Sequence, residues 1–303
     1  MVAETSMIQW ASHRLVFGSR TCVMGILNVT PDSFSDGGRY FSVDSAVAKG
    51  IQLVRDGADI LDVGGESSRP FSDSVSPEEE SQRVAPVIER LARSVSIPIS
   101  IDTTKAEVAR RAIEAGASMI NDISALQGDP GMADVVSDCR VPVVLMHMQG
   151  TPKTMQTAPR YENAALDIRR FLSQTVQFAE SRNIPRSRII IDPGIGFGKT
   201  AEQNLLLIRR LRIFKSLRLP ILVGTSRKSF IRHALGLADD IAPSSGPIET
   251  ATQATVAAAV LNGAHIVRVH DVATTRITVR MIDALKHGCG VEPFTRKVSD
   301  RHG

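Results

Sequence analysis

The sequence predicts one α/β domain built as a (β/α)8 TIM barrel, and three observations favour this fold. Eight short apolar segments alternate with helical patterns along the 303 residues, as repeated βα units do when their strands pair in parallel. These segments do not alternate apolar with polar residues, as expected for parallel strands that are buried on both faces. A barrel of this kind needs about 250 residues, so the chain can hold a complete one with short ends.

The eight expected strands are short and rich in valine, isoleucine and leucine. They are placed at residues 22–28, 60–63, 98–102, 119–122, 141–147, 189–192, 221–224 and 266–269. An open, doubly wound sheet is the alternative arrangement of the same units. The expected domain plan has an N-terminal extension at 1–20 (a β-hairpin with the start of the first strand), the barrel at 21–289 and a C-terminal tail at 290–303.

Helices between the strands are expected from their end residues. Three segments place a hydroxyl residue three positions before Glu or Gln, the pattern of a capping box. They are SPEE at 76–79, TKAE at 104–107 and TAEQ at 200–203. In a weak internal repeat, a glycine is expected to end each of three helices, because glycine most easily adopts the left-handed conformation of a C-terminal cap. It occurs as GAD at 57–59, GAS at 116–118 and GAH at 263–265.

Composition excludes several classes of protein. With 43% apolar and 22% charged residues, the chain is neither disordered nor collagen-like. We find no apolar run near the ~18 residues of a membrane span and no hydrophobic stretch typical of a signal peptide. The net charge of +4 suits an anionic small substrate and is too small and dispersed for nucleic acid. Three scattered cysteines form neither a disulfide framework nor a zinc site, so a reducing cytoplasm is expected.

Polar residues follow the predicted strands at or just past their carboxyl ends. They are Asn28, Asp62, Asp102, Asn121, Asp122, His147, Asp192, Arg268 and His270. The active sites of such barrels are built at this face. Any one of these residues could instead cap the helix that follows, but their convergence on one rim indicates a site. Carboxylates and amides there can bind the N–H edge of a heterocycle, and the cations can hold an anion.

Two further segments add detail to this rim. DPGIGFGKT at 192–200 has Pro193 where a phosphate-binding loop needs glycine, so we expect its glycines to bring the backbone close to a flat ligand instead. TSRKS at 225–229 follows a strand and opens a helix, which favours an anion site over a plain basic turn. His147 and His270 lack the spacing of zinc ligands.

These motifs resemble those of the dihydropteroate synthases. The matching segments run in order: MGILNVTPDSFSDGG at 24–38, DVGGESSRP at 62–70, SIDTTK at 100–105, INDIS at 120–124, LMHMQGTPKTMQ at 145–156, DPGIGFGK at 192–199, TSRKSF at 225–230 and VRVHDV at 267–272. The resemblance implies an enzyme that condenses 6-hydroxymethyl-7,8-dihydropterin diphosphate with p-aminobenzoate, giving 7,8-dihydropteroate and pyrophosphate. It also implies Mg2+ bound with the pyrophosphate, and a homodimer.

The same resemblance implies four sets of site residues. The pterin would be bound by Asp102, Asn121, Met146, Asp192, Phe197 and Lys228. The pyrophosphate would be held by Asn28, Arg69, Arg268 and His270, with Asn28 also beside Mg2+. The p-aminobenzoate would be lined by Phe34, Ser68, Pro70, Phe71 and Ser229. The catalytic residues would be Asp36, Arg69, Asp102 and Lys228.

One departure from the family pattern concerns the second rim loop. The family usually has ESTRPG, and this chain has ESSRPF at 66–71. A phenylalanine ring at position 71 could block the extended substituent of a sulfonamide while leaving room for p-aminobenzoate, so we expect sulfonamide insensitivity. Two other functions compete: a corrinoid-dependent pterin methyltransferase domain and a non-catalytic pterin-binding barrel. The methyltransferase would not need the first rim loop, NVTPDSFSDGG at 28–38, or the TSRKS turn. A non-catalytic barrel would have no use for a pyrophosphate clamp, which the set Asn28, Asp36, Arg69, Lys228 and Arg268 would supply.

Overall fold

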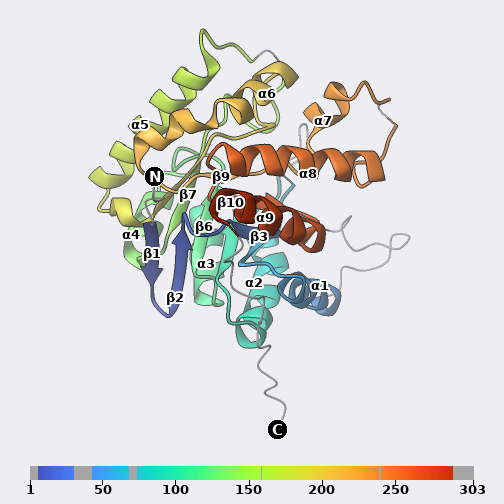
Figure 1. The fold of residues 1–303 in the computed structure, drawn as a ribbon. Coiled ribbons are helices and arrows are strands. Elements are labelled where there is room, and N and C mark those ends of the chain that lie inside the picture. The colour runs from blue at the N-terminus through green and yellow to red at the C-terminus, as the bar shows by residue number, and fades with distance from the viewer. Residues whose placement is uncertain (1–5, 31–42, 68–73, 158, 239, 289–303) are drawn as a thin grey trace.

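The structure is a computed structural model that describes residues 6–30, 43–67, 74–157, 159–238 and 240–288. Its centre is a ring of eight parallel strands (Figure 1). The strands are β3 (Cys22–Asn28), β4 (Ile60–Gly64), β5 (Ile99–Asp102), β6 (Met119–Asp122), β7 (Val143–Met146), β8 (Ile189–Asp192), β9 (Leu222–Val223) and β10 (Ile266–Val269). Each lies within about two residues of its predicted position.

Closure of the ring confirms the barrel and rejects the open sheet. Hydrogen-bonded neighbours run in the order β8-β7-β6-β5-β4-β3-β10-β9. A parallel bridge between Ile191 and Ile221 joins the two ends of this order. The carboxyl ends of all eight strands therefore face the same side of the molecule.

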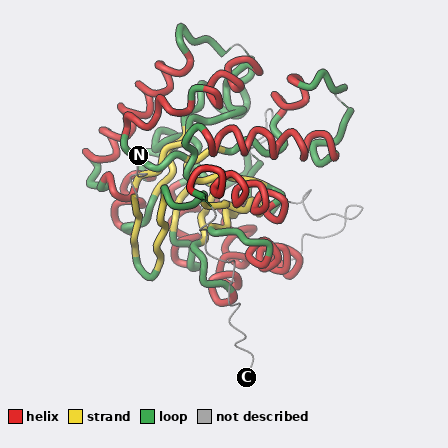
Figure 2. Tube along the Cα trace, viewed as in Figure 1, coloured by secondary structure: helices red, strands yellow, loops and turns green. Residues whose placement is uncertain are grey.

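Helices surround the strands on the outside (Figure 2). They are α1 (Val43–Arg55), α2 (Pro77–Ser94), α3 (Ala106–Glu114), α4 (Met132–Cys139), α5 (Ala164–Ser181), α6 (Ala201–Arg209), α7 (Ser229–Ala234), α8 (Gly246–Leu261) and α9 (Val272–His287), with 3-10 turns η2 (Arg186–Arg188) and η3 (Leu211–Leu217). Their apolar faces pack on the outward side chains of the strands in one continuous core. None of the described helices is both long and apolar enough to cross a membrane.

A hairpin closes one end of the barrel. β1 (Ser6–Trp10) pairs with β2 (His13–Phe17) in antiparallel fashion, and the first barrel strand begins after it, at Cys22. Trp10 and Phe17 of the hairpin belong to a second buried cluster with side chains near the amino ends of the barrel strands, among them Met24. Because this end is filled with apolar side chains, the opposite rim is the open one.

Two of the three predicted capping boxes are present as N-terminal caps. Ser76 accepts from the Glu79 backbone N–H of α2 at 3.1 Å, and Thr200 with Gln203 forms the complete reciprocal box at α6. The expectation for 104–107 was wrong: α3 starts one residue later and Thr104 does not cap it. Asp129, from the next βα loop, supplies the cap by accepting from the Ala106 N–H at 2.8 Å. A distant carboxylate thus replaces the local hydroxyl.

Candidate functional site

Four polar side chains from separate strands meet in the open mouth of the barrel. Arg268 of β10 donates from Nε to Asp62 Oδ2 of β4 at 2.6 Å and from Nη2 to Asp102 Oδ2 of β5 at 2.5 Å. Asn121 of β6 donates to the same Asp62 oxygen at 3.0 Å. Asp62 is fully buried, and the Arg268 side chain is 15% exposed. Asp62 therefore fixes the orientation of both neighbours.

Asp102 and Asp192 are hard to ionise because they are buried. Burial raises the pKa of Asp102, and the guanidinium of Arg268 opposes that shift. Burial likewise raises the pKa of Asp192, at the end of β8, to about 6; its hydrogen bond from the Gly194 N–H and the charges of Lys199 and Lys228 act in the opposite direction. A ligand that donates hydrogen bonds to these carboxylates would favour their charged form.

A small apolar cluster stands beside the carboxylates. It consists of Ile123, Met146, Met155 and Phe197, all buried, with Met148 packed against it. The Lys228 ammonium lies 3.8 Å from the centroid of the Phe197 ring, which is cation–π distance. Sulfur-containing and aromatic side chains next to fixed acceptors suit a flat heterocycle that stacks on one face and donates hydrogen bonds at its edge.

The loop after β8 lies tightly against the loop after β7. Gly194 has φ +69°, and a Cβ there would lie 1.9 Å from the carbonyl oxygen of His147, so only glycine fits this close approach. The sequence prediction had these glycines bringing the backbone close to a flat ligand; at Gly194 the close neighbour is the loop after β7. Buried Lys199 also joins the two loops, through the Phe197 carbonyl at 2.7 Å and the His147 ring at 3.1 Å.

The turn after β9 presents several of the predicted anion-binding residues. Ser226 Oγ lies 2.9 Å from His270 Nδ1 and links this turn to the end of β10. Arg227 adopts φ +60°, uncommon for a non-glycine residue, and its side chain pairs with Glu249 of α8 at 2.6 Å. Ser229, the first residue of α7, is exposed. Ser229 is therefore accessible to solvent.

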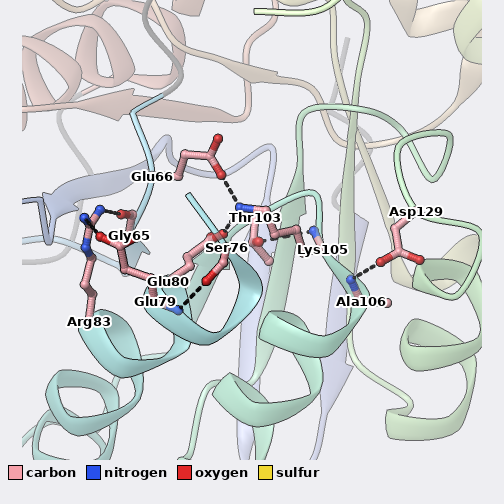
Figure 3. A network of polar contacts seen from close by, with 10 residues as sticks. All are labelled: Gly65, Glu66, Ser76, Glu79, Glu80, Arg83, Thr103, Lys105, Ala106 and Asp129. Atoms are coloured by element: carbon pink, nitrogen blue, oxygen red, sulfur yellow. Dashed lines mark hydrogen bonds and ion pairs between the residues drawn. The ribbon is translucent and has the colours of Figure 1, made fainter. Parts of the chain in front are cut away.

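A second polar network lies at the edge of the same rim (Figure 3). The Lys105 ammonium is paired with Glu66, which follows β4, and with Glu80 of α2 at 2.6 Å. Beside it is a cavity of about 360 Å³ whose lining includes Glu66, Asp102 and Met148. Lys105 thereby links the residues just before the second rim loop to helix α2, which follows that loop.

Not every polar strand end points to the site. Asp122 accepts from the backbone N–H groups of Ser124 at 2.8 Å and Leu126 at 2.7 Å, so it stabilises its own loop, as a helix-capping carboxylate would. His147 packs edge-on to Phe171, and burial lowers its pKa to about 3. The described residues contain no cluster of three or more His, Cys, Asp or Glu side chains that could hold a metal.

The structure brings a part of the predicted site together. Asn28, at the half-buried end of β3, lies on this rim with the ends of the other strands. Six predicted residues lie outside the described part of the chain: Phe34, Asp36, Ser68, Arg69, Pro70 and Phe71. Sequence reasoning placed Asp62 on the rim and Ser226 in the expected anion-binding turn, but gave neither a ligand contact. It assigned no role to Lys105 or Lys199, which reach their partners through contacts between loops.

Comparisons with known proteins identify the family over most of the chain. Residues 24–270 match the family model described as pterin binding enzyme. A dihydropteroate synthase from Synechocystis is 46% identical over 269 residues, which cover 89% of this chain and 91% of the relative.

Solved structures give the same result. Xanthomonas albilineans dihydropteroate synthase with 4-aminobenzoic acid has a TM-score of 0.86 at 43% identity, covering 93% of this chain and 99% of that one. The same bacterial enzyme in complex with 7,8-dihydropteroate has a TM-score of 0.82 at 42% identity, covering 93% and 99%.

Proposed function

This chain belongs to the pterin-binding enzyme family, among its dihydropteroate synthases, and we propose how its residues carry out that reaction. As a transferase, it joins 6-hydroxymethyl-7,8-dihydropterin diphosphate to p-aminobenzoate, forming 7,8-dihydropteroate and releasing pyrophosphate. One observation supports these roles. In the open end of the barrel, the ion pairs of Arg268 with Asp62 and Asp102 lie beside the apolar cluster around Phe197.

The pterin is held by acceptors at its edge and by apolar side chains at its face. Asp102, Asn121 and Asp192 supply oxygens for the ring N–H groups. All three are largely buried, and Asn121 is fixed by Asp62. Met146 and Phe197 pack on the ring. Since burial opposes ionisation of both carboxylates, hydrogen bonds from the ring favour the charged state that binds it.

The diphosphate is held by Asn28, Arg69, Arg268 and His270. Arg268 approaches from β10 and is oriented by two carboxylates, whereas His270 is held by Ser226. Mg2+ fits the amide oxygen of Asn28 at the end of β3, because Mg2+ is often bound by few protein ligands together with substrate phosphates. When bound, it would neutralise charge on the leaving pyrophosphate.

The reaction needs charge neutralisation more than a strong nucleophile. The C–O bond between the pterin methylene and the diphosphate breaks, and its electron pair leaves with pyrophosphate. The aniline nitrogen of p-aminobenzoate forms the new C–N bond and then loses a proton. Lys228 would contact both substrates, which its position beside Phe197 supports, and Arg69 and Asp36 of the rim loops would complete the set.

The p-aminobenzoate is lined by Phe34, Ser68, Pro70, Phe71 and Ser229. Exposed Ser229 offers a hydroxyl donor for its carboxylate. Phe71 replaces the usual glycine of this loop, and we propose that it makes the enzyme less sensitive to sulfonamides than its relatives with glycine. The support is the size of the ring and the shape of the drug, which extends past the carboxylate of the substrate.

A homodimer in the cytoplasm is the proposed state of the protein. The outer face of α9 exposes three large apolar residues one turn apart: Ile277 at 72%, Met281 at 62% and Leu285 at 68%. Exposure of such an apolar stripe to water is unfavourable, and a second copy of the chain would cover it. The three cysteines are scattered along the chain, a usage that favours a reducing compartment.

Pyrophosphate release tests these roles. Turnover should require the pterin diphosphate, p-aminobenzoate and Mg2+ together, and it should stop with EDTA and resume when Mg2+ is added. A pterin methyltransferase domain would release no pyrophosphate, and a non-catalytic barrel would bind the pterin without turnover. Full activity in metal-free buffer would remove Mg2+ from the reaction.

A further inference from the structure

Lys199 is the most deeply buried lysine among the described residues, and it lies outside the predicted site. Its residue exposure is 3%. The ammonium donates to the carbonyl of Phe197 at 2.7 Å and to that of His147 at 3.3 Å, and it lies 3.1 Å from His147 Nδ1. Three bonds to two different loops fix its position.

The partners of this ammonium are neutral. Burial keeps His147 uncharged, since it lowers the pKa of that ring to about 3. In the described part of the chain, Lys199 has no carboxylate within ion-pair distance. A buried cation without a paired anion is costly, so its retention calls for a reason beyond stability.

The negative charge that acts on Lys199 is that of Asp192, at the start of the same loop. Asp192 Oδ1 accepts from the Gly194 N–H at 2.7 Å, and a Cβ on Gly194 would lie 3.3 Å from Lys199 Nζ. The loop therefore folds back and brings the ammonium towards the carboxylate. Each group shifts the other towards its charged form.

We propose that Lys199 is a positioning residue for pterin binding, which holds the β7 and β8 loops together and keeps Asp192 ionised. This inference rests on the pterin role given to Asp192 above. The bond to the Phe197 carbonyl fixes one residue of the apolar cluster that would pack on the pterin, and the bonds to His147 fix the loop that directly follows Met146, another residue of that cluster. One side chain thus links both residues.

The charges that face these two groups decide the pH behaviour. Asp192 is faced by Lys199 of its own loop, Lys228 of the turn after β9 and Arg268 of β10. Lys199 is faced by Asp192 and Lys228, and by neutral His147. Burial lowers the pKa of Lys199 to about 7, so it is mostly charged near pH 6, where Asp192 titrates. Loss of its charge would raise the pKa of Asp192.

Two variants separate the charge of Lys199 from its hydrogen bonds. Lys199→Gln keeps a donor and loses the charge, whereas Lys199→Met loses both. The control is Tyr161→Phe, which removes an uncharged hydrogen bond of 2.7 Å to Gly198 of the same loop. For each protein we would measure kcat and both KM values from pH 5 to 9, with thermal unfolding as the check of folding.

In Lys199→Gln and Lys199→Met, the acidic limb of kcat/KM for the pterin substrate should move up by about one pH unit, as expected for the loss of a close opposite charge. Lys199→Met should also raise the pterin KM about tenfold and leave the KM for p-aminobenzoate nearly unchanged. If Lys199→Met does not fold, the Lys199→Gln profile alone decides.

Three results would overturn the inference. They are an acidic limb in Lys199→Gln that coincides with wild type, an equal displacement in Tyr161→Phe, and equal increases in the two KM values. Wild-type activity in Asp192→Asn would instead refute the pterin role of Asp192 and the inference with it. An inactive Asp192→Asn beside a wild-type pH profile in Lys199→Gln refutes the inference alone.

Discussion

Removal of the Asp62 carboxylate tests the ion-pair cluster at the barrel mouth. Asp62 Oδ2 accepts from Arg268 at 2.6 Å and from Asn121 at 3.0 Å, and the side chain is fully buried. Breaking a buried ion pair on one side costs about 3–5 kcal/mol. Arg268 keeps Asp102 at 2.5 Å, so we expect the lower end, about 3 kcal/mol, for Asp62→Ala. Asp62→Asn keeps an acceptor oxygen and should lose about 1.5 kcal/mol.

Urea unfolding at pH 7 measures these free energies, and kcat/KM for the pterin diphosphate measures the accompanying loss of orientation. The matched control is Asp44→Ala, which breaks an exposed pair with Arg90 and should change stability little. In a double-mutant cycle, Asp62→Ala and Arg268→Ala should be non-additive by at least about 1 kcal/mol. Strict additivity, or an Asp62→Ala protein as stable as wild type, would refute the reasoning.

Four further outcomes are expected. Asp192→Asn should lower kcat/KM for the pterin substrate at least about tenfold, because an amide donor then faces a ring donor. At pH 7 it should unfold no more easily than wild type, since burial raises the Asp192 pKa from 3.8 to about 6 and the associated stability is lost as pH rises through that value. In wild type, kcat/KM for the pterin should fall as pH drops through about 6, which a pH-rate profile would show. Asp129→Ala should destabilise the protein by about 1 kcal/mol in urea unfolding and Thr104→Ala much less, because Asp129 caps α3. For Phe71→Gly, Ki for sulfamethoxazole should fall about tenfold or more while KM for p-aminobenzoate stays nearly constant; parallel changes would exclude the steric clash.

The barrel could be predicted because its evidence is local and repeated. Apolar segments recur in every unit, and glycines such as Gly57 with φ +106° and caps such as Thr200 recur in several of them. The capping prediction at Thr104 was wrong because a competing carboxylate, Asp129, caps Ala106 from 23 positions further along the chain. A sequence pattern records the local hydroxyl and not the distant acceptor that displaces it.

The site could be predicted only where a side chain follows a strand directly. Asp102, Asn121 and Asp192 end strands, and the barrel geometry alone brings them to one rim. Lys105 and Lys199 hold loops together through contacts that span 39 and 52 positions. Their partners are fixed by the path of the loops, which composition and periodicity do not encode.

Strands β8 and β9 are joined by a single bridge, between Ile191 and Ile221, which makes this joint the shortest strand pairing of the barrel. β9 has only two residues, and across this joint the Ile191 N–H donates to the Pro220 carbonyl at 3.0 Å. Asp192 ends β8, and Lys228 follows β9. A pterin held by both residues would bridge these two strands at the open rim. We expect native-state amide exchange at Ile191 to be the fastest within the eight strands. It should slow when the pterin binds, because the bound substrate would stabilise the one strand pairing that few backbone hydrogen bonds hold.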